Sequence, residues 1–333
     1  MLAIERRRSG IRTPRWSALL ISEFRRRKAP GRGPPFKASP SGNVKFNVDL
    51  VRKTETPITM SAAKTSQRER VQKPIRYPSK PIFHVRDEDA IRTDDQSADE
   101  EAAFRKGRAA AACRVMVDEG FEHCSIVVSI RDALDPTRIW ISPRHRALGL
   151  VKQSEFLPVK LVEDAHETEG IDPSAWANHL SIYGARPDVN AVIQGATPFA
   201  RAFSTHGQPI GMFCQDACIF YRQVSVMSSS TDSHSVSAAL GPGKALLVTN
   251  WGQMVASVSI ESAVSYFIRI ENLCKAQVYA EAAARGRGEK PVAIGDEECR
   301  FTWEKTGDEA HGSALALPYF ARVERQSAGS HLQ

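Results

Sequence analysis

Reactive side chains are few and widely spaced in this chain of 333 residues, which has six cysteines and nine histidines. No Cys-x-x-Cys motif is present, and Cys214 and Cys218 have the i,i+4 spacing of a helical core stripe. Gly241-Pro-Gly-Lys244 superficially resembles a phosphate-binding loop, but it lacks that motif's spacing and its Ser/Thr, and Pro242 has no amide hydrogen. These residues predict neither a cysteine metal site nor a phosphate loop. Because no disulfide framework is suggested, we expect a reducing compartment.

The positive charge of the chain is concentrated at its N-terminal end. The whole chain has a formal net charge of +7 and a sequence pI of about 9.1. Residues 1–60 hold 14 Lys and Arg against 4 Asp and Glu, so residues 61–333 carry a net charge of −3. The basic pI therefore does not point to a nucleic-acid partner, and we expect none. No run of about 18 uncharged apolar residues is present, so we expect no membrane-spanning helix.

Residues 1–100 are predicted to be a disordered basic and Pro-rich extension. Their arginine blocks and Pro/Gly-rich stretch leave too little apolar surface to offset the entropy of ordering the chain. Three interpretations stay open: a disordered tail or upstream-extended gene product with Met60 as alternative start, a mitochondrial transit peptide, or a basic arm for acidic partners. We expect a cytoplasmic location, or a mitochondrial one if the Arg-rich residues 1–28 are a transit peptide.

The hydrophobic pattern of residues 101–290 predicts one domain in which helices mix with short strands. Apolar residues at helical spacing predict helices at 103–119, 173–183, 198–203 and 259–284. Apolar, largely β-branched runs predict strands at 124–130, 139–141, 156–162, 191–193 and 244–248, the last running into a turn at Asn250-Trp251-Gly252. Because there is no strict βαβ rhythm, we predict an α/β/α sandwich around a mixed sheet. Residues 291–333 are expected to pack on this domain or on a partner subunit.

Two stretches of the domain carry a family likeness. The first is Asp172-Pro-Ser-Ala-Trp-Ala-Asn-His179 with Ile182–Ile193 after it, and the second is Leu246–Gly252 followed by Ile260-Glu-Ser-Ala263 and a long helix. These motifs resemble the class II aldolase/adducin family, over roughly residues 105–285. The resemblance implies a three-layer α/β/α domain around a mostly antiparallel sheet. It also implies a homo-oligomer, a tetramer with pockets between its subunits.

The resemblance does not extend to the metal-binding and acid/base residues of the family. Its catalytic members bind a divalent metal, usually zinc, through three histidines, and use a glutamate as acid/base. The His-x-His pair falls here on Gln194 and Ala196, the third histidine on Trp251, and the glutamate on Ala175. Ala and Trp offer no metal ligand, and Gln offers one weak oxygen. We therefore predict a member of the family that has no metal and no cofactor.

The surroundings of the former metal position are predicted to be mainly apolar, with a few polar groups. Such a composition is typical of a small-molecule site. Two interpretations of His179 stay open: a buried, hydrogen-bonded histidine, or an acid/base group in the pocket. Gln194, His179 and Trp251 are the catalytic candidates, and the predicted substrate-binding residues are Ser174, Ala175, Trp176, Ala196, Asn250, Arg144 and His145.

The favoured hypothesis is a repurposed, metal-free biosynthetic enzyme. It would catalyse an isomerisation, a cyclisation or a pericyclic step of Diels–Alder type on a largely apolar specialised metabolite. Orientation alone can contribute about 7–11 kcal/mol to such a reaction, and a hydrogen bond from Gln194 or His179 would polarise a carbonyl. Two alternatives are a non-catalytic, adducin-like cytoskeletal protein and a regulatory pseudoenzyme that assembles with an intact paralogue.

Overall fold

A seven-stranded sheet runs through the chain in the computed structural model, which describes residues 97–161, 169–229 and 235–333. Its strand order is β3-β2-β1-β4-β7-β6-β5, and every pair is antiparallel except β5 with β6. The strands are β1 (Val127–Arg131), β2 (Arg138–Ile141), β3 (Leu157–Lys160), β4 (Ala191–Gly195), β5 (Val224–Met227), β6 (Ala245–Val248) and β7 (Gly252–Ser257). The predicted N-terminal extension, with Met60, lies almost wholly outside the described residues.

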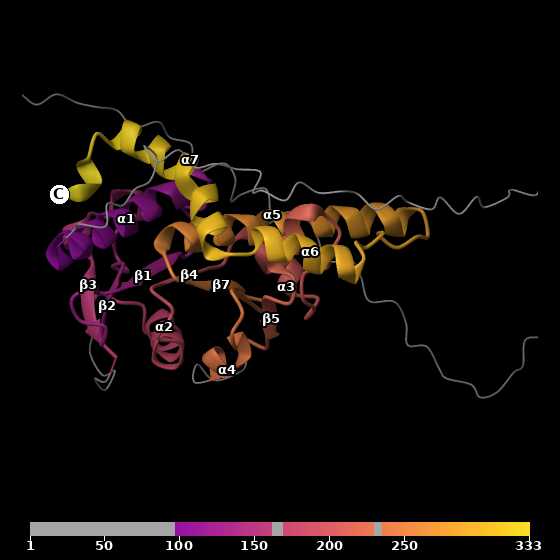
Figure 1. The fold of residues 1–333 in the computed structure, drawn as a ribbon, viewed down its shortest axis with the longest axis horizontal. Helices are drawn as coiled ribbons and strands as arrows, with labels where there is room; N and C mark the ends of the chain where they lie inside the picture. The colour runs from indigo at the N-terminus through magenta and orange to yellow at the C-terminus, as the bar shows by residue number, and fades with distance from the viewer. Residues whose placement is uncertain (1–96, 162–168, 230–234) are drawn as a thin grey trace, which may run out of the picture. The chain divides into compact units, whose positions relative to one another are not determined.

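Helices cover both faces of this sheet (Figure 1). One face carries α1 (Ala98–Asp118), α3 (Pro198–Ser204) and α5 (Ile260–Gly286), with α7 (Glu309–Ser327) packed across α5 and α1. The other face carries α2 (Pro173–Ala185) and α4 (Val236–Leu240). The predicted α/β/α sandwich with a mostly antiparallel sheet is therefore confirmed. Among the described residues, none of the helices combines the length and the apolar character needed to cross a bilayer.

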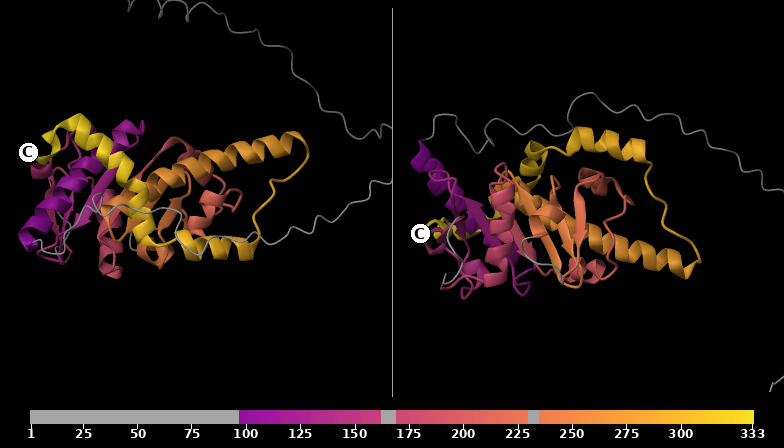
Figure 2. Two further views of the ribbon diagram at one scale, coloured as in Figure 1. Left: turned by 45° about the horizontal axis from the view of Figure 1, so that its top comes forward. Right: turned by 90° about the horizontal axis from the view of Figure 1, so that it is seen from below.

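The long helix α5 extends past the sheet, and α6 (Asp296–Thr306) leads the chain back towards α7 (Figure 2). On its way α6 packs against the 3-10 helix η4 (Gln215–Phe220), where Cys218 and Cys299 are buried together. The described part of the chain also contains three short 3-10 turns: η2 (Leu148–Leu150), η3 (Gln153–Glu155) and η6 (Ser330–Leu332).

Two strands of the sheet were not predicted from the sequence. Strand β5 is short, and β7 follows directly after the predicted turn at Asn250-Trp251-Gly252. All six residues of β7 are buried, and its sequence Gly-Gln-Met-Val-Ala-Ser has neither polar alternation nor a β-branched run. It is a strand because β4 and β6 pair with it on both sides, which is a tertiary effect.

Gly252 allows β4 and β7 to meet closely at the centre of the sheet, and Gly195 leaves room for Ile126 and Phe267. Gly252 has a φ of 157°, and a Cβ atom there would overlap the carbonyl oxygen of Gly195 and lie 2.8 Å from the Cα of Ala196. A Cβ on Gly195 would lie 2.8 Å from Ile126 and 3.1 Å from Phe267. The preceding turn residue, Asn250, has a φ of 62°, which Asn tolerates better than most residues. This close approach of the two paired strands brings the end of β4 against the turn that carries Trp251.

Lys244 is a buried cation at the start of β6 that holds the α6–α7 connection. Its Nζ atom donates to the Tyr266 hydroxyl and to the Gly307 carbonyl, both at 2.6 Å, and lies 3.4 Å from a carboxylate oxygen of Glu309. The Tyr266 hydroxyl donates in turn to the Asp308 carbonyl at 3.0 Å. The Gly-Pro-Gly-Lys segment therefore ends in a structural contact between the sheet and α7.

Replacing Lys244 with Met should destabilise the fold by about 1–3 kcal/mol, because buried acceptors lose their donor. The measurement is urea unfolding followed by circular dichroism. Lys305→Met, at an exposed position on α6, removes the same charge and should change the free energy of unfolding by less than about 0.5 kcal/mol. Equal stability of the two variants would contradict a holding role for Lys244.

Candidate functional site

Helix α2 brings most of the predicted site residues against the sheet. Asp172 caps it: one carboxylate oxygen accepts from the backbone N–H of Ser174 at 3.0 Å and of Ala175 at 3.1 Å. Pro173 occupies the first turn, where its missing N–H costs no helical hydrogen bond. The buried residues then recur at helical spacing, which turns one face of α2 to β1 and β4. They are Ala175, Trp176, His179, Ile182 and Tyr183.

Gln194 is a buried polar residue on the face of β4 that is turned to α2. It pairs with Val127 of β1 and Met254 of β7, and only 2% of its surface is exposed. Its Oε1 atom accepts a hydrogen bond from the Asn178 Nδ2 atom at 3.2 Å. That bond uses one of the two acceptor sites of the amide oxygen and orients the Gln194 amide, so its Nε2 group is available as a donor.

His179 is fully buried in a short hydrogen-bonded chain between α2 and β1. Its Nδ1 atom lies 2.7 Å from the Ser129 hydroxyl, which lies 3.0 Å from the Tyr183 hydroxyl. Burial lowers the pKa of His179 to about 3, so its ring is neutral at physiological pH. Burial also raises the pKa of Tyr183 above its usual range. The Nε2 atom of His179 has no partner among the described residues.

The remaining predicted site residues divide into buried and exposed groups. Ala175 and Ala196 are buried, and Trp251 is half-buried against the same apolar cluster as Trp176 and Met254. The Trp176 Nε1 atom is buried without a partner among the residues described. The exposed ones are Ser174, Asn250, Arg144 and His145. Arg144 and His145 lie in the loop after β2, where the Arg144 N–H donates to the Gly170 carbonyl.

Three residues of this region were not among the sequence candidates. Asn178 orients Gln194, while Ser129 and Tyr183 hold His179. A serine among the apolar residues Val127, Val128 and Ile130 of β1 was a signal for a buried polar contact. Asn178 carried no such signal, because its partner lies on β4, 16 positions further along the chain.

The residues at the former metal position do not fit a metal ion. Ala196 and Trp251 have no ligand atoms, and the one oxygen of Gln194 already accepts from Asn178. Within residues 97–161, 169–229 and 235–333, no three His, Cys, Asp or Glu side chains gather into a metal-ligating group. The chemistry open to these side chains is hydrogen bonding and apolar contact.

A family model described as "Class II Aldolase and Adducin N-terminal domain" matches residues 108–278. The chain belongs to this family. The family prediction made from residues 172–193 and 246–263 is therefore confirmed. The fold also resembles the solved structure of an L-fuculose 1-phosphate aldolase from Glaciozyma antarctica PI12. That structure has a TM-score of 0.65 and 28% identity, covering 72% of this chain and 96% of the other.

Two similar curated relatives are enzymes by name. "Decarboxylase NovR" of Streptomyces niveus is 27% identical over 225 residues, which cover 64% of this chain and 81% of the relative. A "4-hydroxy-3-prenylphenylpyruvate oxygenase/4-hydroxy-3-prenylbenzoate synthase" of Streptomyces roseochromogenus subsp. oscitans is 27% identical over 228 residues. Those residues cover 64% of this chain and 79% of that relative. The chain thus spans most of the length of both.

The burial of His179 predicts a specific dependence of stability on pH. Because folding lowers its pKa from the usual 6.5 to about 3, protonation favours the unfolded chain. The stabilisation is complete well above pH 6.5, and its loss approaches about 1.4 kcal/mol per pH unit well below pH 6.5. Because half of the unfolded histidine is already protonated at pH 6.5, wild-type protein should lose about 1 kcal/mol more than His179→Gln between pH 6.5 and 5.5, measured by urea unfolding.

The control for this comparison is His145→Gln, at an exposed position, which should keep the wild-type slope. Burial also lowers the pKa of His311 and His331, so all three proteins retain part of the slope. Identical slopes for wild type and His179→Gln would show that His179 is not held neutral by the fold.

Proposed function

We propose that this protein is a metal-independent enzyme that rearranges a largely apolar small molecule by isomerisation, cyclisation or a pericyclic step. The setting would be the biosynthesis of a specialised metabolite. The observation that carries the proposal is the oriented amide of Gln194, which lies near Ala196 and Trp251, the residues that the family resemblance aligns with metal ligands.

The Gln194 amide can supply the one polar contact that such a reaction needs. Asn178 holds the amide oxygen, so the Nε2 group is preset to donate a hydrogen bond to a substrate carbonyl. A donor that is fixed before the substrate binds stabilises developing negative charge without reorganisation. The neutral ring of His179 would offer its unpaired Nε2 atom as a second contact.

The apolar neighbours would fold the substrate rather than react with it. Trp251 and Trp176 border one apolar cluster, and Ala175 and Ala196 leave room where a glutamate and a histidine stand in catalytic relatives. Ser174, Asn250, Arg144 and His145 are exposed, and we assign them to the rim of the site. Holding two reacting parts of one molecule together contributes mainly through orientation.

The names of the relatives support a small-molecule enzyme whose substrate has a large apolar part. One relative is named as a decarboxylase, and the other as an oxygenase of a prenylated phenylpyruvate and a synthase of a prenylated benzoate. The two cavities described below are lined by neither Gln194, His179 nor Trp251. We therefore include in the proposal that a second copy of the chain completes the substrate pocket, as a homo-oligomer would allow.

Mass conservation gives a direct test, because isomerisation, cyclisation and intramolecular cycloaddition all leave the molecular mass unchanged. The full-length protein, treated with EDTA, is incubated with an apolar extract of its source organism and followed by liquid chromatography and mass spectrometry. One compound should be replaced by a product of equal mass, and added Zn²⁺ or Fe²⁺ should not accelerate the change.

Variants then connect the conversion to the site. Gln194→Leu should lower kcat/KM by about 100-fold, as for loss of one preorganised donor, whereas Gln208→Leu, at an exposed position, should not. A product that has lost carbon dioxide or gained oxygen, or a strict need for added metal, would overturn the proposal. Absence of any conversion together with co-sedimentation with actin would favour the adducin-like alternative, and co-purification with an intact paralogue would favour the pseudoenzyme.

Substitutions of Asn178 test the orientation of the Gln194 amide separately. An aspartate there accepts hydrogen bonds but, when ionised, cannot donate one, so Asn178→Asp should turn the Gln194 amide over and engage its Nε2 group. We expect kcat/KM to fall at least about tenfold while the melting temperature stays close to that of wild type. Asn178→Ala, which frees the amide without inverting it, should retain more activity than Asn178→Asp. The reverse order would contradict this role.

A further inference from the structure

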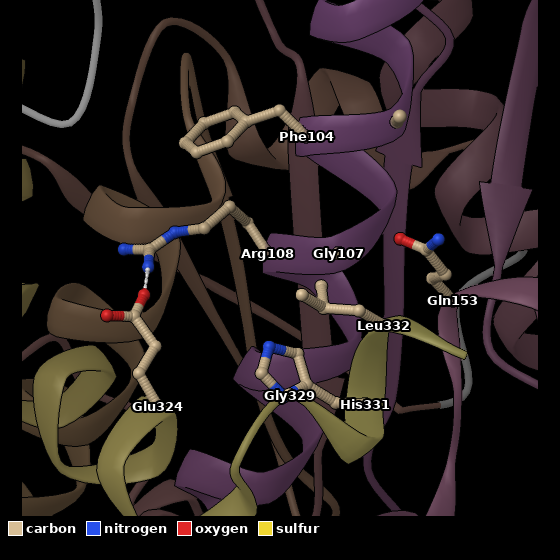
Figure 3. A pocket seen from close by; sticks show the side chains of 9 residues that line it. Phe104, Gly107, Arg108, Gln153, Glu324, Gly329, His331 and Leu332 are labelled. Carbon is tan, nitrogen blue, oxygen red and sulfur yellow. Dashed lines mark hydrogen bonds and ion pairs between the residues drawn. The ribbon is translucent and has the colours of Figure 1, made fainter.

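Two adjoining cavities flank the N-terminal half of α1, on the face of the sheet opposite to Gln194. The larger, of about 550 Å³, lies between α1 and the C-terminal turn η6, and Figure 3 shows its lining side chains. The smaller, of about 330 Å³, lies between α1 and the loop and strand around Asp132 and Trp140. Ala103 and Gln153 line both, so the two cavities are neighbours along one side of the helix.

The larger cavity is mainly apolar, and its one arginine, Arg108, is paired with carboxylates, although its buried Nη2 atom has no partner among the described residues. Phe104 projects into it from α1 and Leu332 from η6 (Figure 3). Arg108 is already paired twice, with Glu324 at 2.6 Å and with Glu261 at 2.7 Å. Its guanidinium also lies 3.7 Å from the ring centre of Phe320. Because Glu324 lines this cavity, an anionic group would be repelled here and an apolar one accepted.

The smaller cavity contains a lysine that forms no direct ion pair with a described residue. The Nζ atom of Lys106 lies 3.8 Å from the ring centre of Trp140, and the negative charge of Asp132 acts on it from nearby. The nearby carboxylate of Asp132 is occupied, since it accepts from Arg138 at 2.6 Å and from the Trp140 Nε1 atom at 3.0 Å. Burial lowers the pKa of Lys106, an unfavourable effect that an anion beside the ammonium would offset.

We propose that the two cavities together bind a small amphipathic carboxylate, with its carboxylate at Lys106 and its apolar body against Phe104 and Leu332. The volumes are in the range of small-molecule sites. The charges set the orientation of the ligand, because Glu324 is at one end and Lys106 is at the other. The site lies across the sheet from Gln194, since Trp140 packs with the α1-side core and Gln194 contacts α2. It is therefore independent of the proposed reaction.

Decanoate and decanol are the probes for this site, because they share an apolar chain and differ in charge. Isothermal titration of the full-length protein at pH 7.5 should show decanoate binding at least about tenfold more tightly than decanol. Lys106→Gln should remove that difference, since a hydrogen bond to a charged group commonly contributes a factor of ten or more. Lys275→Gln is the matched control, because Lys275 also lies over an aromatic ring, that of Phe199, at 5.2 Å.

A second variant tests the apolar half without depending on Lys106. Leu332 is 49% exposed, so Leu332→Glu should fold normally, and it should weaken decanoate and decanol alike by at least about tenfold. Melting temperatures of all variants are measured alongside. Equal binding of the two probes, or wild-type binding by Lys106→Gln, would overturn the proposal. If the wild-type protein binds neither probe, because another part of the chain or a second copy covers the cavities, the proposal is also overturned. Failure of the reaction at Gln194 would leave these binding results unaffected.

Discussion

The close approach of β4 and β7 at Gly195 and Gly252 is the constraint on which the candidate site depends. Gly252 lacks the Cβ atom that would overlap the Gly195 carbonyl, so the end of β4 can lie against the turn before β7. Gln194 and Ala196 flank the first glycine, and Trp251 precedes the second. Any side chain at Gly252 would separate these three residues. Gly252 therefore keeps Gln194, Ala196 and Trp251 together at one end of β4.

The sheet separates two environments with different chemistry. On the α2 side, Asn178 holds Gln194 and Ser129 holds His179, while the Nε1 atom of Trp176 and the Nε2 atom of His179 have no partner among the described residues. On the α1 side, ion pairs are concentrated near the C-terminal helix: Arg108 joins α1 to α5 and α7, and Arg322 of α7 pairs with Asp118 of α1. The first environment favours a neutral, preorganised contact with an apolar molecule. The second favours a ligand with one charged end.

The C-terminal part of the chain contributes more than a covering layer. Lys244 ties the start of β6 to the α6–α7 connection, and Phe320 packs under the guanidinium of Arg108. The turn η6 then forms one wall of the cavity beside α1. Residues from the end of the chain therefore complete both the core and a binding surface that α1 begins, more than 200 positions earlier.

Local patterns in the sequence were sufficient for the family and the layered fold, while the loss of the metal ligands stays a prediction. Asp172 before Pro173 predicts the start of α2, the apolar run at Ala191 predicts β4, and residue identity alone reveals Gln194 where a histidine is expected. Strand β7 escaped prediction because its pairing partners, not its composition, make it a strand. The hydrogen bond from Asn178 to Gln194, the burial of His179 and the cavity between α1 and η6 were decided only by the tertiary structure. Each depends on contacts between side chains from different elements of the fold, and a local sequence pattern does not specify such contacts.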